Sequence, residues 1–206
     1  PEICRTLWRY LREGGGANIR AFYRYLGATF FQLPLSVPPP RPLPAIGIFH
    51  PELDVGTVAA WEARWIPGAP RVALLFYRAH LQAGNIQVFD ALCGSLLACG
   101  LNPLPLALIS LKDPLCLDTV RRLCREQAVS LVLNSTAFAR GGMESVADTP
   151  LLDDVPVVQI LLSGGNEAAW ESDPHGLQPR DIAMQVALPE MDGHIISRAV
   201  SFKGLQ

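Results

Sequence analysis

The sequence lacks the short motifs that identify several large classes of enzyme. It contains no GxxxxGK[ST] loop for a triphosphate, no GxGxxG after its first expected strand, no GxSxG nucleophile elbow and no HExxH zinc motif. Its two glycine-rich stretches, GGGAN and SGGNE, do not have the spacing of a phosphate-binding loop. A self-contained hydrolase or NAD-dependent enzyme is therefore not expected.

Charge of either sign and long apolar runs are also scarce. Only 17% of the residues are charged, and 17 basic residues against 19 acidic ones leave a net charge of −2. Without a basic face, nucleic acid is not an expected partner. The apolar runs are far shorter than the ~18 residues of a membrane span, and the N-terminal residues suggest an arginine-bearing amphipathic helix, not a signal peptide. Half of the residues are hydrophobic, as in a core-forming globular chain.

Paired cysteines are missing as well. The five cysteines are an odd number and include no CxxC pair. Cys93, Cys99 and Cys124 fall on apolar positions of expected helices. Buried free thiols in a reducing cytoplasm explain this pattern better than a metal cluster does, so we expect a cytoplasmic protein.

Two helices and a proline-rich linker are expected before the main domain. Residues 1–33 form a helical N-terminal segment in this interpretation, with Asn18 capping the second helix and Gly27 ending it. The linker covers residues 34–44, and the stretch LPLSVPPPRPLP has too many prolines for a regular helix or a central strand. A stiff, extended linker is the first interpretation, and a ligand for a proline-binding module is the alternative.

Buried strands alternate with amphipathic helices over residues 45–206. Strands are expected at 45–50, 71–79, 104–110, 129–136, 155–163 and 194–202, and helices at 57–65, 85–100, 117–127 and 179–193, with Thr57 and Asp118 as the caps of the first and third of these helices. Strands without polar alternation are covered on both faces, and strands that alternate with helices form parallel sheets. We therefore predict an α/β fold. Its Rossmann-like or flavodoxin-like domain would have an open, mostly parallel twisted sheet of about five strands, with helices on both faces.

Polar residues follow each expected strand. Ligands of open parallel sheets bind beyond the carboxyl ends of the strands, so these residues would share one edge. Arg78 and His80 are two positions apart and would point the same way from a strand. The further candidates at this edge are His50, Tyr77, Gly84, Lys112 and Asn134. The alternative is that such residues only cap the next helix or close a loop.

The segment LPEMDG, residues 188–193, places Glu190 and Asp192 at the end of an expected helix. Two carboxylates beside a cationic histidine could shift the pKa of that histidine or bind a cation. The alternative is a helix stop with a tight Asp-Gly turn. His175 and His194 are expected in loops, in contact with solvent and not with a metal.

Several long stretches resemble one family. LFYRAHLQAGN, DALCGSLLACGLNPLPLALISLKDP, AMQVALPEMDG and RAVSFKG are similar to the large subunit of aerobic cobaltochelatase (the CobN type), which is related to the large subunit of magnesium chelatase. The resemblance covers effectively the whole chain, and because the family's subunits are far longer, we expect an N-terminal-side fragment. The magnesium branch has a similar RSH and ALPELDG, whereas FYRAH, SLKDP and VSFKG are nearer to the cobalt branch. This chain has Ala79 where serine is common.

The resemblance implies that the complete enzyme inserts Co²⁺ into a corrin-type tetrapyrrole, hydrogenobyrinic acid a,c-diamide, in aerobic cobalamin biosynthesis. Two AAA+ partner subunits would use ATP and Mg²⁺, and the remaining domains of the large subunit would be further partners. The isolated fragment would be inactive. One alternative is a scaffold that docks the ATPase partners. The other is the magnesium chelatase large subunit, which acts on protoporphyrin IX.

The resemblance implies roles for the shared motif residues Arg78, His80, Glu190, Asp192 and Gly193, and the strand-end pattern suggests roles for the others named here. His80, Glu190 and Asp192 would be catalytic, and His80 and His50 would bind the metal. Arg78 would pair with a substrate carboxylate, because a guanidinium suits that geometry. The other residues expected to contact the substrate are Tyr77, Gly84, Lys112, Asn134 and Gly193.

Overall fold

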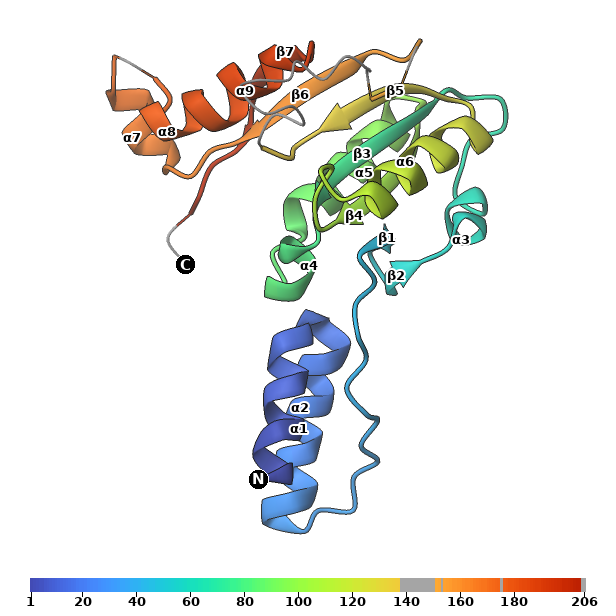
Figure 1. Ribbon diagram of the computed structural model, residues 1–206, viewed down its shortest axis with the longest axis vertical. Coiled ribbons are helices and arrows are strands. Elements are labelled where there is room, and N and C mark those ends of the chain that lie inside the picture. The colour runs from blue at the N-terminus through green and yellow to red at the C-terminus, as the bar shows by residue number, and fades with distance from the viewer. Residues whose placement is uncertain (138–150, 153, 175, 205–206) are drawn as a thin grey trace.

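The computed structural model describes residues 1–137, 151–152, 154–174 and 176–204. Two N-terminal helices, α1 (Glu2–Glu13) and α2 (Gly15–Phe31), form a hairpin that extends away from the α/β body, and residues 32–44 run back along it without regular secondary structure (Figure 1). The domain boundaries given above stay a prediction.

Helix α2 differs from the prediction at both ends. It begins at Gly15, so Asn18 is buried inside the helix and is not its cap. The Asn18 amide instead donates to the Arg41 carbonyl at 2.8 Å and accepts from the Arg41 N–H at 2.9 Å, which fixes the proline-rich segment to the helix. Gly27 does not end the helix, which continues to Phe31.

The body contains one sheet of seven strands in the order β2-β1-β4-β3-β5-β6-β7. The strands from β3 to β7 are mutually parallel. Counted from β3, their order is 2-1-3-4-5, which is the flavodoxin-like arrangement. The prediction of a mostly parallel α/β sheet is therefore confirmed. The strands are β1 (Ile46–His50), β2 (Asp54–Gly56), β3 (Arg71–Tyr77), β4 (Asn102–Leu108), β5 (Val129–Asn134), β6 (Val157–Leu162) and β7 (Ile195–Ser201).

Of the seven observed strands, only β2 has no counterpart among the stretches expected to be strands, and β1 differs from the prediction in its direction. β1 runs antiparallel to β4, with Ile46 opposite Leu108, and β2 pairs antiparallel with β1. Antiparallel strands can be joined by a short turn, whereas parallel ones need a long crossover. The strand pattern of residues 45–50 was recognised, but its direction was not.

Helices cover both faces of the sheet. On one face, α3 (Val58–Glu62) and α5 (Gln87–Ala98) contribute Trp61, Phe89 and Cys93 to a buried cluster, and on the other α6 (Pro114–Glu126) contributes Cys116 and Val120. Alternate residues of β3 enter the two clusters, as the pleat of a strand requires. The two apolar layers hold the parallel strands between them.

Two helix starts tested the predicted caps. Thr57 caps α3, as expected. Helix α6 begins earlier than predicted and is capped by Asp113, whose carboxylate accepts the Cys116 N–H at 2.9 Å, so Asp118 is not the cap. Asp113, a polar residue that follows β4, therefore caps the next helix.

The last crossover runs through α7 (Glu167–Ser172), α8 (Pro179–Ile182), the π-helical turn η1 (Ala183–Ala187) and α9 (Leu188–Met191). The wide turn precedes Pro189, which has no N–H to donate and would crowd the carbonyl four residues back in a regular α-helix. In the part of the chain that is described, no helix is long and apolar enough to cross a membrane.

Candidate functional site

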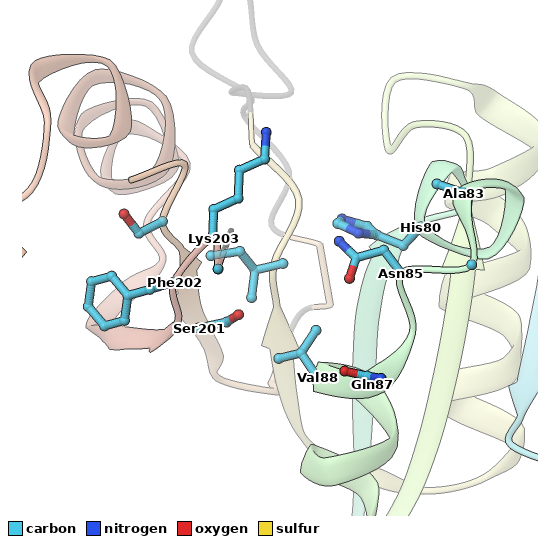
Figure 2. A pocket seen from close by; sticks show the side chains of 12 residues that line it. His80, Ala83, Asn85, Gln87, Val88, Ser201, Phe202 and Lys203 are labelled. Atoms are coloured by element: carbon cyan, nitrogen blue, oxygen red, sulfur yellow. The ribbon is translucent and has the colours of Figure 1, made fainter. Parts of the chain in front are cut away.

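A cavity of about 700 Å³ opens at the carboxyl ends of β3, β6 and β7 (Figure 2). This is the sheet edge where the sequence predicts a ligand site. One wall is the segment that follows β3, and the other is formed by the tips of β6 and β7. The lining residues are His80, Ala83, Gly84, Asn85, Gln87, Val88, Leu162, Ser163, Ser201, Phe202, Lys203 and Gly204.

His80 lies on α4 (Ala79–Ala83) and not on an extension of β3. Its ring packs edge-on against Phe89, with ring centroids 4.9 Å apart. Burial lowers the pKa of His80 below its ordinary value of 6.5, because a desolvated imidazole loses the stabilisation that water gives to its charged form. The ring is therefore neutral at neutral pH, which is the form that accepts a proton or binds a metal ion.

Arg78 diverges from His80, contrary to the prediction that both point the same way. β3 ends at Tyr77 and Arg78 is the N-cap of α4, so the two-residue repeat of a strand does not apply. The Arg78 guanidinium donates to the Leu43 carbonyl at 2.9 Å and to the Pro44 carbonyl at 3.0 Å. These bonds hold the end of the proline-rich segment, and Arg78 does not line the cavity.

Three further candidates lie at the expected edge but outside the cavity. The Tyr77 hydroxyl donates to a backbone carbonyl beyond β5. The buried Asn134 amide donates to Gln159 at 2.9 Å and accepts from the Thr136 hydroxyl at 2.8 Å. Lys112 is exposed in the loop between β4 and α6. Of the predicted substrate-binding residues at this edge, only Gly84 lines the cavity, where it ends α4 with φ +72°.

His50 lies away from this edge. Because β1 is antiparallel to β4, the carboxyl end of β1 lies beside the amino half of β4. The His50 ring is buried against Trp61, with ring centroids 5.4 Å apart, and its Nδ1 accepts the Glu52 N–H at 3.3 Å. The prediction that His50 joins His80 at one edge is wrong.

The LPEMDG segment is also at the other end of the sheet. It precedes β7, which is parallel to β6, whereas the cavity is formed by the residues that follow β7. A seven-residue strand separates the two by ~20 Å. Glu190 is exposed, Asp192 is partly buried, and Gly193 stops the helix by donating to the Glu190 carbonyl at 3.0 Å.

The predicted convergence of Glu190, Asp192 and Gly193 with His80 is therefore wrong. A role for the two carboxylates in the reaction stays a prediction for a different surface. His194 is not a solvated loop residue either: it is buried, and its Nδ1 lies 3.2 Å from the Gln159 side-chain oxygen. His175 lies outside the described residues.

Sequence reasoning missed the second wall of the cavity. Lys203 stands across the cavity from His80 and Asn85, as Figure 2 shows, and Ser201 lies beside it at the tip of β7. Ser163 donates to the buried Asp181 carboxylate at 2.9 Å. The rule that polar residues follow the strands, applied to the last strand and its RAVSFKG sequence, would have identified Ser201 and Lys203.

No ready metal centre is found in the described residues, where no group of three His, Cys, Asp or Glu side chains could hold an ion. His80 supplies one imidazole, and none of the described residues that line the cavity is acidic. The cavity therefore offers a neutral base, hydroxyl and amide groups, and one ammonium.

Comparison with known proteins identifies the family. The family model described as CobN/Magnesium Chelatase matches residues 8–206. The chain belongs to this family. It is 44% identical over 204 residues to the aerobic cobaltochelatase subunit CobN of Pseudomonas aeruginosa, and 38% identical over 211 residues to that of a Sinorhizobium species. These alignments cover 99% and 97% of the chain but only 16% of each relative, so the chain spans about a sixth of their length.

A solved structure of this family has the same architecture. The catalytic subunit of cobaltochelatase from Mycobacterium tuberculosis superposes with a TM-score of 0.78 at 28% identity, covering 100% of this chain and 17% of that one. A magnesium-chelatase subunit of Chlorobaculum parvum is 25% identical over 91% of the chain and 16% of its own length. The resemblance noted from the sequence is confirmed.

Proposed function

We propose that this chain is part of the large, tetrapyrrole-binding subunit of an ATP-dependent cobaltochelatase. The enzyme would insert Co²⁺ into hydrogenobyrinic acid a,c-diamide in aerobic cobalamin biosynthesis, in the cytoplasm. The 44% identity to a CobN subunit over 99% of the chain carries this proposal. The lower identity of 25% to a magnesium-chelatase subunit favours cobalt over magnesium. Two AAA+ subunits would use ATP and Mg²⁺, since the chain has no phosphate-binding loop of its own.

The cavity at the sheet edge is the part of the chain best suited to the macrocycle. Its volume of about 700 Å³ falls within the ~300–1,000 Å³ of typical small-molecule sites. Metal insertion removes two N–H protons from the ring and replaces them with a cation. A neutral His80 can accept one of these protons or contribute one ligand to the cobalt ion, which is a substrate here. The remaining ligands would be the nitrogens of the macrocycle itself.

The role of His80 is tested by titrating the 206-residue chain with the macrocycle and Co²⁺, followed by visible absorption. We expect His80→Ala to weaken binding of the cobalt complex by about tenfold, which corresponds to ~1.4 kcal/mol. Arg125→Ala is the control, because Arg125 is exposed on α6 and does not line the cavity. Equal binding by wild type and His80→Ala would overturn this role.

A scaffold function is the second candidate, and the helical hairpin favours it. Tyr23 is 67% exposed, Phe31 is 74% exposed and Trp8 is 55% exposed. Such exposed aromatic side chains are enriched at protein interfaces. In this alternative, the hairpin docks the ATPase subunits or other domains of the large subunit, and the chemistry lies outside this chain.

A pull-down with the AAA+ subunits tests the scaffold function. Tyr23→Ser and Phe31→Ser together should abolish capture while far-UV circular dichroism stays unchanged, because both side chains are exposed. Deletion of residues 1–44 is the second arm. If the wild-type chain captures neither ATPase subunit, the docking function is wrong.

A further inference from the structure

The described residues that line the cavity carry a net positive charge. Lys203 is the one charged side chain among the described lining residues, and no acidic side chain lies there to balance it. His80 adds no charge at neutral pH, because burial lowers its pKa. The Lys203 ammonium projects into the space opposite His80 and Asn85 (Figure 2). An anionic group would be attracted to this space.

The backbone at the tip of β7 holds Lys203 in this position. The Lys203 N–H donates to the Gly165 carbonyl at 2.8 Å, and the Ser201 carbonyl accepts the Ser163 N–H at 2.8 Å. The Phe202 ring packs on Trp170 with ring centroids 5.1 Å apart and is turned away from His80, as Figure 2 shows. Because neighbouring side chains of an extended segment point to opposite sides, Lys203 is directed inward.

A buried carboxylate that contacts this wall is already engaged. Asp181 is buried, accepts the Ser163 hydroxyl at 2.9 Å and the Gly164 N–H at 2.9 Å, and does not line the cavity. These bonds fix the tip of β6 to α8. Asp181 is therefore a structural acceptor, and the Lys203 ammonium remains available to a ligand.

The opposite wall presents the start of α5. Gln87 and Val88, its first two residues, both line the cavity, and no side chain of the described residues caps this helix. The first-turn N–H groups of a helix have no intrahelical acceptor and carry a partial positive charge. Asp90 lies in the same turn but does not line the cavity. An uncapped helix start therefore faces a lysine across the cavity.

We propose that the cavity binds a carboxylate side chain at the periphery of the tetrapyrrole, with Lys203 as its ion-pair partner and Asn85 and the first turn of α5 as hydrogen-bond donors. This inference rests on the proposed function and adds the chemical group that is recognised. His80 lies on the same wall of the cavity as Asn85. Binding of the carboxylate would therefore hold the macrocycle beside the His80 imidazole.

The test compares the free-acid macrocycle with its methyl ester, which has the same ring but no carboxylate charge. Lys203→Met should weaken binding of the free acid by about tenfold or more and reduce its salt dependence. Lys203→Arg should restore most of the affinity, and Arg125→Met, at an exposed position of α6 outside the cavity, should have no effect. The ester should bind wild type and Lys203→Met equally. If Lys203→Met binds the free acid as tightly as wild type, the inference is overturned even where His80→Ala weakens binding.

A second measurement keeps the inference separate from the proposed function. Succinate is titrated into the ¹⁵N-labelled chain, and the backbone amide resonances of Asn85, Gln87 and Val88 are followed by NMR. They should shift in the wild-type chain and not in Lys203→Met. Unshifted resonances in the wild-type chain would refute the carboxylate site, whatever the macrocycle does. A carboxylate response without macrocycle binding would support the site and refute the proposed function.

Discussion

At the scale of single residues, His80 and Arg78 show how two neighbours acquire different tasks. The His80 ring lies in the cavity against Phe89, and the Arg78 guanidinium is bonded to the carbonyls of Leu43 and Pro44. The two side chains diverge because the short helix α4 begins at Ala79, between them. One side chain is thus available for chemistry, and the other holds the proline-rich segment in place.

The burial of His80 has a measurable consequence for pH. The folded-state pKa of His80 lies below the ordinary 6.5, so its protonation monitored by NMR should have a midpoint below 6.5. Because the unfolded chain binds this proton more readily, the associated stability is fully present above pH 6.5 and is lost as the pH falls through the lowered pKa. His80→Asn should remove this part of the pH dependence of unfolding. A midpoint above 6.5 would contradict the burial of the ring.

Removal of Arg78 should loosen the proline-rich segment. Arg78→Ala deletes two charge-assisted hydrogen bonds, so the free energy of unfolding in urea should fall by about 2 kcal/mol, and proteases should cleave within residues 34–44 more quickly. Arg122→Ala is the control, since its pair with Glu126 is exposed and worth only ~0.5 kcal/mol. Equal effects of the two substitutions would argue against the role of Arg78 in holding the proline-rich segment.

At the scale of elements, the turn between α1 and α2 packs against α4, the helix that carries His80. Gly14 has φ +63° and ψ −162°, a conformation that is essentially restricted to glycine. A Cβ atom added there would lie 2.5 Å from the Gln82 carbonyl oxygen. The Gln82 side chain in turn donates to the Arg12 carbonyl at 3.2 Å. The helical hairpin is therefore seated on the helix that carries His80.

Gly14→Ala should undo this contact. The strained backbone and the collision with α4 should lower the free energy of unfolding by about 2–4 kcal/mol in urea denaturation. Gly94→Ala is the matched control, because Gly94 is exposed inside α5 and an added Cβ would meet nothing within 4 Å. That change should stabilise the chain by ~0.5–1 kcal/mol. A stable Gly14→Ala variant would show that the hairpin is not held at this turn.

At the scale of the whole molecule, the sheet joins two apolar layers, and each layer contains buried thiols. Cys93 lies in the layer under α5, and Cys116 and Cys124 lie in the layer under α6. The expectation of buried free thiols is confirmed for Cys93 and Cys124, but Cys99 is exposed because it lies just beyond the end of α5. The thiols therefore report on both faces of the sheet.

Thiol modification should separate two classes of cysteine. Cys4 and Cys99 should react with iodoacetamide at pH 8 in the folded chain, whereas burial raises the pKa of Cys93 and of Cys124 to about 12 and leaves too little thiolate to react. In dilute urea Cys93 and Cys124 should become reactive at the same rate, because both layers share β3. Different rates, measured by peptide mass spectrometry, would mean that the two faces open independently.

The residue order alone determined the elements that depend on local pattern. Apolar runs without polar alternation identified β3 through β6 as buried strands, and proline density excluded regular structure from residues 34–44. These signals are strong because each depends only on a few neighbouring residues: an apolar run indicates a buried strand, and prolines have no N–H group to donate to regular structure. The general location of the cavity, beyond the carboxyl ends of parallel strands, was predictable for the same reason.

Only the tertiary structure decided which polar residues meet. The direction of β1 moves His50 away from His80, the parallel direction of β7 puts Glu190 and Asp192 at its far end, and the same direction brings Lys203 to the cavity. The direction and order of the strands depend on how the connecting segments pack over the sheet. This packing involves residues that are distant in the chain. A local sequence pattern does not contain information about contacts between distant residues. It therefore identified the edge of the sheet where the cavity lies, but only part of the residues that line it.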